Sequence, residues 1–200
     1  LEVLHYFQAV ERKPWRFDTR YSGGNLLESS VHELDFARSI FGEASSVYCE
    51  VSGKEEYDGY VSPIVLQAII KYEAGGSVVF RQGGIVAYPS KGSWIAGTTG
   101  MLSFDSWDGP VNHHASGSDT PSIIPTEEVY AYDLELQDLI TAIEGGGEPE
   151  NSGMTGLKNI ALGLAMYQSM ESGQVVSFSD GLPVGVAEDY QYRGPNAFKE

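Results

Sequence analysis

The change of hydrophobic period at Gly42 constrains the fold more than any other feature of this sequence. Five apolar residues before it recur at helical spacing: Leu27, Val31, Leu34, Ala37 and Phe41. They predict a helix over residues 25–41, with Gly42 as its stop. From residue 45 to about Val111, short apolar runs are separated by Gly, Pro, Asp and Ser, which is typical of antiparallel strands. A helix beside such a block of strands indicates an α+β domain.

The remaining elements complete this architecture. The predicted strands are residues 1–10, 47–51, 64–72, 77–81, 93–96, 101–104 and 174–178. Gly75 and Gly76 predict a hairpin turn between two of them. After a loop at 108–125, two more helices are expected, one with an apolar stripe between Tyr132 and Ile143 and one from Ser152 to Gly173. We therefore expect helices on one face of a mainly antiparallel open sheet, and a second copy of the chain on the other face.

Composition excludes several classes of function. The chain has 200 residues, which suits one domain, and its formal net charge of −16 argues against nucleic acid and anionic membranes as partners. Its single cysteine, Cys49, allows no internal disulfide and fits a reducing, cytoplasmic location. No apolar run approaches the roughly 18 residues that a membrane span needs. The chain also opens directly in a strand at Leu1, which we interpret as a sign that a further segment precedes it.

Three ionisable residues in the first helix are the strongest candidates for chemistry. Glu28, His32 and Asp35 have the spacing i, i+4, i+7, so one continuous helix would present them along one stripe. Because imidazole titrates near neutral pH, His32 could accept and return a proton, and a flanking carboxylate could orient it. The alternative is that His32 is a structural hydrogen-bonding residue.

This stretch resembles a known signature. Gly23-Gly24, an acidic residue at 28, His32 and Asp35 are similar to the opening of the second domain of the Gfo/Idh/MocA oxidoreductases, the relatives of glucose-fructose oxidoreductase and inositol dehydrogenase. Trp15-Arg16 before the glycines fits the same family. Further similar segments follow: Glu144-Gly145-Gly146, Gly156 to Asn159, Tyr167-Gln168-Ser169 and Gly173 to Val176. The resemblance covers nearly the whole chain, although the family usually has Asp where Glu28 stands.

The resemblance implies a domain arrangement and an activity. Residues 1–200 would form the C-terminal, dihydrodipicolinate-reductase-like domain for substrate binding and oligomerisation, and an N-terminal Rossmann domain outside this chain would bind NAD or NADP. The parent would oxidise or reduce a CH–OH group of a sugar or polyol, and this domain alone would be inactive. His32 and Glu28 would be catalytic, and Asp35 would contact substrate or serve structure. An NAD-dependent glycosidase and a non-catalytic binding or assembly module on the same fold remain open.

The remaining motifs give weaker predictions about function. Trp15 and Arg16 either contact the sugar or form a surface pair at the domain boundary. His113-His114 is interpreted as part of a solvated loop, and no metal site is predicted. No Gly-x-Gly-x-x-Gly motif follows a strand, so cofactor-binding residues are not expected in this chain. Lys13, in the segment Glu11-Arg12-Lys13-Pro14, is not predicted to be catalytic, because the resemblance implies that the family's lysine lies upstream of this chain.

Overall fold

The structure is a computed structural model that describes residues 2–8, 22–57, 60–83, 85–104, 109–125 and 129–185. The helices in these ranges are α3 (Gly24–Glu28), α4 (Val31–Phe41), α5 (Ala131–Gly145) and α6 (Gly153–Ser172). The strands are β1 (Glu2–Gln8), β2 (Ala44–Tyr57), β3 (Tyr60–Tyr72), β4 (Ser77–Gly83), β5 (Ile85–Ala96), β6 (Gly100–Phe104), β7 (Val111–Ala115), β8 (Ser122–Ile124), β9 (Val176–Ser179) and β10 (Leu182–Pro183).

The described strands form one mixed sheet in the order β10-β9-β2-β3-β4-β1-β5-β6-β7-β8. Neighbouring strands run antiparallel except β1 and β4, which are parallel. The first strand of the chain therefore lies in the middle of the sheet. Gly75 and Gly76 join β3 to β4 with φ values of 95° and 89°, a left-handed backbone that glycine adopts without steric cost, so the predicted hairpin is confirmed.

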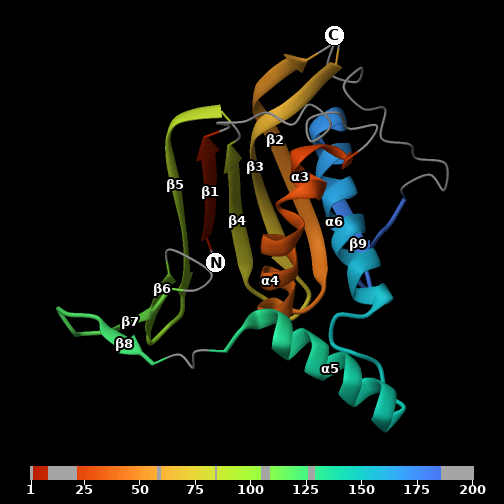
Figure 1. Cartoon of the computed structure of the whole chain (residues 1–200). Coiled ribbons are helices and arrows are strands. Elements are labelled where there is room, and N and C mark those ends of the chain that lie inside the picture. Colours follow the sequence, from red (N-terminus) through yellow and green to blue (C-terminus); the bar gives the residue numbers. More distant parts are fainter. Residues whose placement is uncertain are drawn as a thin grey trace.

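Three helices, α3, α4 and α6, pack on one face of the sheet and leave part of that face uncovered. Figure 1 shows them over the β2 and β3 side, whereas β1 and β5 have no described helix in front of them. The core lies between this helical layer and the sheet, and its fully buried members include Leu26, Leu34, Val47, Ile70, Phe80 and Met166. The prediction of an α+β domain with helices on one face of a mainly antiparallel sheet is confirmed.

Two sequence-based expectations about elements were wrong. The predicted helix at 25–41 is divided into α3 and α4 by a turn at Ser29 and Ser30. The predicted loop at 108–125 contains β7 and β8. The polar residues of β7 hide the alternation expected of a strand, but antiparallel pairing with β6 on one side and β8 on the other supplies its backbone hydrogen bonds.

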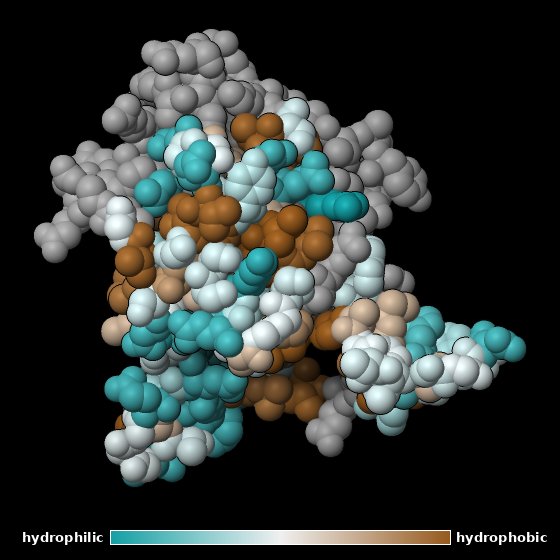
Figure 2. All heavy atoms as spheres, turned by 180° about the vertical axis from the view of Figure 1, so that it is seen from behind, coloured by the Kyte–Doolittle hydropathy of each residue, from teal (hydrophilic) through white to brown (hydrophobic). Residues whose placement is uncertain are grey.

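The opposite face of the sheet carries both apolar and polar groups. Ile69 on β3 is 50% exposed there, with Gln67 and Lys71 exposed on the same strand. Figure 2, which views the molecule from behind, shows apolar patches beside hydrophilic ones on this side. Among the helices that the structure describes, none is both long and apolar enough to span a membrane.

Candidate functional site at the break between α3 and α4

The break between α3 and α4 places the two candidate catalytic residues on different helices. The amides of Ser29 and Ser30 donate to the carbonyls of Asn25 and Leu26, at 3.0 and 3.1 Å, and these bonds close α3. Ser30 is fully buried and its carbonyl accepts from Leu34 N at 3.1 Å, which starts α4. Glu28 is consequently the last residue of α3, and His32 is the second residue of α4.

The glycines before α3 are held by α6. Gly23 and Gly24 have φ values of 74° and 80°, a left-handed backbone conformation that residues with a Cβ atom rarely adopt. The hydroxyl of Tyr167 on α6 donates to the Gly23 carbonyl at 2.8 Å, and the Tyr167 side chain is fully buried. Burial raises the pKa of this phenol above its ordinary value, so the hydroxyl keeps its proton and remains a donor.

The body of α3 is fixed from two further sides. The side-chain amide of Gln82 on β4 donates to the Asn25 carbonyl at 3.3 Å in the buried interior. Across the helical layer, Gly163 of α6 faces Leu27 so closely that a Cβ at residue 163 would collide with the Leu27 side chain. The backbone of α3 therefore depends on a sheet contact and on a helix contact, and Glu28 projects from a well-supported segment.

His32 lies beside the uncovered part of the sheet. Phe36, one helical turn beyond His32, packs edge-on against Phe104 of β6, with the ring centroids 5.4 Å apart. Residues i and i+4 share one flank of a helix, so His32 is on the flank of α4 that is turned toward β6. Its side chain is exposed, whereas Glu28 is half-buried. The imidazole is thus accessible, at the border of the region where β1 and β5 have no described helix in front of them.

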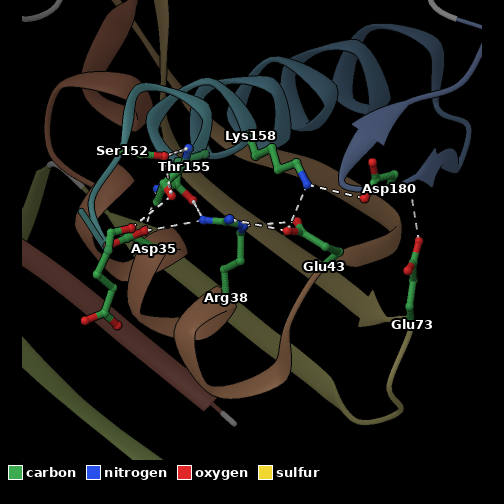
Figure 3. A network of polar contacts seen from close by, with 10 residues as sticks. Asp35, Arg38, Glu43, Glu73, Ser152, Thr155, Lys158 and Asp180 are labelled. Atoms are coloured by element: carbon green, nitrogen blue, oxygen red, sulfur yellow. Dashed lines mark hydrogen bonds and ion pairs between the residues drawn. The ribbon is translucent and has the colours of Figure 1, made fainter. Parts of the chain in front are cut away.

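Asp35 occupies a different environment. Its carboxylate accepts a hydrogen bond from the side-chain amide of Asn159 on α6 and lies 3.8 Å from a guanidinium nitrogen of Arg38. Figure 3 shows Asp35 directed into a polar network that joins α4 to α6 and to the turn before β10. This position ties two helices together.

Glu43 is the centre of that network. Its carboxylate accepts from Arg38 Nε and from Lys158 Nζ, both at 3.0 Å, and Lys158 also reaches Asp180 at 3.5 Å (Figure 3). Burial alone would raise the pKa of Glu43, but the hydrogen bonds from Arg38 and Lys158 outweigh it and lower the pKa. The hydrogen bond to Glu43 in turn raises the pKa of Lys158.

These shifts define the pH range in which the network stabilises the fold. The contribution of Glu43 is present above the ordinary glutamate pKa and is lost as pH falls through its lowered value. That of Lys158 is present below the ordinary lysine pKa and is lost as pH rises through its raised value. The network is therefore complete across the neutral range, and we interpret it as structural.

Some residues proposed from the sequence cannot be placed. Trp15 and Arg16 lie outside the described residues. His114 on β7 is 3.0 Å from the Ser103 hydroxyl, and in the described ranges no three His, Cys, Asp or Glu side chains form a group that could hold a metal ion. The structure adds roles that sequence reasoning missed for Tyr167 and for Ser169, whose hydroxyl accepts from Cys49 N at 2.9 Å and donates to the Gln174 carbonyl at 2.7 Å. The sequence feature that could have pointed to both residues is the Tyr167-Gln168-Ser169 triplet.

Comparison with known proteins identifies the family. Residues 2–178 match the model of the "Oxidoreductase family, C-terminal alpha/beta domain" of Gfo/Idh/MocA proteins. The chain belongs to the Gfo/Idh/MocA oxidoreductase family. This Gfo/Idh/MocA domain is 25% identical over 189 residues to a 1,5-anhydro-D-fructose reductase from Ensifer adhaerens, a match that covers 88% of this chain and 55% of the relative. It thus spans about half the length of that relative.

Solved structures share the fold of this Gfo/Idh/MocA domain. An aldose-aldose oxidoreductase from Caulobacter crescentus, complexed with glycerol, superposes with a TM-score of 0.75 at 22% identity, covering 88% of this chain and 55% of the other. A levoglucosan dehydrogenase in complex with NADH and levoglucosan gives a TM-score of 0.72 at 18% identity, covering 90% and 58%. The relatives are oxidoreductases that include sugar reductases and dehydrogenases.

Proposed function

We propose that this chain is the substrate-binding and oligomerisation domain of an NAD(P)-dependent oxidoreductase that acts on a CH–OH group of a sugar, polyol or related compound. A Rossmann domain upstream of residue 1 would bind the dinucleotide. The observation that carries the proposal is the exposed imidazole of His32, which borders the part of the sheet without a described helix, in a chain whose family is a family of oxidoreductases. The names of the relatives support a sugar-like substrate and a nicotinamide cofactor.

In the proposed reaction His32 handles the proton. The nicotinamide, when bound, would supply the acceptor for the hydride of the carbinol carbon. The hydroxyl proton passes to the free ring nitrogen of His32 as the C–O bond becomes a carbonyl, and the imidazolium later releases that proton to solvent. Glu28, one residue before the break, would orient the imidazole or accept a substrate hydroxyl. Trp15 and Arg16 would add a stacking surface and a hydrogen-bonding cation.

The contacts of Asp35 favour a structural role for this residue over direct substrate binding. Its carboxylate is engaged by Asn159 and lies close to Arg38, so α4 is fixed against α6 one turn after His32. In the proposed enzyme, Asp35 would keep α4 in the orientation that presents the imidazole.

The proposal includes assembly and location. A homo-oligomer formed through the open sheet face would bury Ile69, and the free, buried thiol of Cys49 suits a cytoplasmic protein.

Turnover of the full-length parent tests the function. His32→Asn should lower kcat by about a hundredfold or more, because a general base contributes roughly that factor, and should leave Tm unchanged because the side chain is exposed. His114→Asn, which removes an imidazole on β7, is the control and should leave kcat unchanged.

The outcomes separate the alternatives. Unchanged turnover in His32→Asn would remove the proton-transfer role. A parent with no dehydrogenase activity on sugars or polyols, with either cofactor, would favour the non-catalytic module. Cleavage of a glycoside in the presence of NAD would favour the glycosidase.

A further inference from the structure

Helix α5 is an amphipathic helix with no described partner for its apolar stripe. None of its residues is buried. The stripe consists of five side chains that are between 38% and 71% exposed: Tyr132, Leu136, Leu139, Ile140 and Ile143. In Figure 1, α5 lies at the lower edge of the molecule and its C-terminal end projects beyond α6. An apolar surface of this kind on a folded domain usually marks a contact with another protein surface.

The exposed apolar surface continues before the helix. Val129 and Tyr130 are 45% and 65% exposed. The rings of Tyr130 and Tyr132 are 5.3 Å apart, so the segment leading into α5 and its first turn form a continuous aromatic surface. The apolar stripe of α5 is thus extended at its N-terminal end.

The charge around the stripe argues against a second copy of this chain as the occupant. Residues 92–157 contain no lysine or arginine. On a helical wheel, Glu135 lies along one side of the stripe, and Asp133 and Glu144 lie along the other. Two α5 helices packed against each other would bring these carboxylates together, which is unfavourable. The fitting partner is an apolar strip bordered by lysine or arginine.

The length of the relatives indicates where such a partner lies. The chain covers only 55% of the 1,5-anhydro-D-fructose reductase and 55% of the aldose-aldose oxidoreductase, so nearly half of each relative is polypeptide that this chain does not span. We infer that the apolar stripe of α5 docks onto an apolar, basic-rimmed surface of the upstream cofactor-binding domain, so that α5 fixes the position of that domain relative to His32. This inference rests on the proposed function, which supplies the upstream domain.

Hydrogen exchange of residues 131–145 tests the docking directly. The full-length parent and the present 200-residue chain are compared at equal concentration. Docking should slow exchange of these amides in the parent by about tenfold or more, because opening α5 would then require release of the packed stripe.

Matched variants identify the face that docks. Leu136→Gln combined with Ile143→Gln should return exchange in the parent toward the rate of the isolated chain. Leu134→Gln changes an equally apolar side chain on the opposite side of α5, where it is 59% exposed, and should leave the protection in place. Gln is a good helix former, so each variant keeps the helical propensity of α5.

Each other outcome overturns the docking. Equal exchange in parent and isolated chain means that α5 has no partner in the parent. Protection in the isolated chain that grows with concentration assigns the stripe to a second copy, and protection there that is independent of concentration assigns it to another segment of this chain. Turnover measured on the same parent keeps the two proposals apart: an active parent with unprotected α5 loses only the docking, and an inactive parent with protected α5 loses only the function. A parent without an upstream domain overturns both.

Discussion

At the scale of residues, Tyr167 links the longest described helix to the backbone that positions Glu28 and His32. Its hydroxyl donates to the Gly23 carbonyl, and Gly23 is the N-cap of α3. A tyrosine far along the sequence thereby supports the candidate site without touching its reactive groups.

Removing this donor should cost stability. Tyr167→Phe should lower the free energy of unfolding by about 1–2 kcal/mol, because the Gly23 carbonyl then loses its hydrogen bond in a partly buried position. Urea denaturation followed by circular dichroism measures the change. Tyr132→Phe, at a side chain that is 68% exposed, is the control and should be neutral. If the two variants are equally stable, the Tyr167 bond contributes nothing to the fold.

At the scale of elements, α6 approaches α3 through a glycine. Gly163 allows the Leu27 side chain to occupy the space that a Cβ would need, whereas a Cβ at Gly156, two turns earlier in the same helix, would meet nothing within 4 Å. The two glycines therefore have different reasons to be in α6. One permits close packing, and the other only lowers helix propensity.

Alanine at these two positions should have opposite effects. Gly163→Ala should destabilise the domain by about 1–3 kcal/mol through overpacking against Leu27. Gly156→Ala should stabilise it by about 0.5–1 kcal/mol, because alanine has less backbone freedom to lose in a helix. Thermal unfolding of both variants checks this pair of signs. A stable Gly163→Ala would show that α3 and α6 can move apart at no cost.

The sequence predicted the presence of helices and strands better than the positions at which they are interrupted. The stripe from Leu27 to Phe41 gave the helical layer correctly, but Ser29 and Ser30 are compatible with both a helix and a turn, so periodicity could not reveal the division between α3 and α4. The spacing of Glu28 and His32 likewise predicted that they lie near each other. It could not predict the hydrogen bond from the Tyr167 hydroxyl to the Gly23 carbonyl, because that bond depends on the fold that brings α6 to Gly23. The roles of His32 and Glu28 stay predictions.

At the scale of the whole molecule, the two layers leave a mixed apolar and polar sheet face without a described cover. Ile69 stands half-exposed at β3, two strands away from β1 in the sheet order, with Val79 opposite it on β4. An apolar centre surrounded by polar groups such as Gln67 and Lys71 is the composition expected of an interface between copies. This location supports the proposed oligomer.

A charge at Ile69 should prevent that assembly. We expect the 200-residue chain to elute as a dimer or larger species in size-exclusion chromatography with light scattering, and Ile69→Lys to elute as a monomer with unchanged circular dichroism, because a lysine buried between two copies loses its hydration. Ile143→Lys on α5 is the matched control and should leave the assembly intact. A wild-type chain that is monomeric at high concentration would contradict the role of this face.

The position of β1 has a consequence for how the molecule is made. Glu2 pairs with Val79 on one side and Trp94 on the other, and β4 and β5 are joined in the sheet only through this strand. During synthesis β1 would stay unpaired until β4 and β5, which follow it by many residues, had also left the ribosome. Such contacts between distant parts of the sequence slow folding, and the waiting strand is the segment on which a chaperone would act.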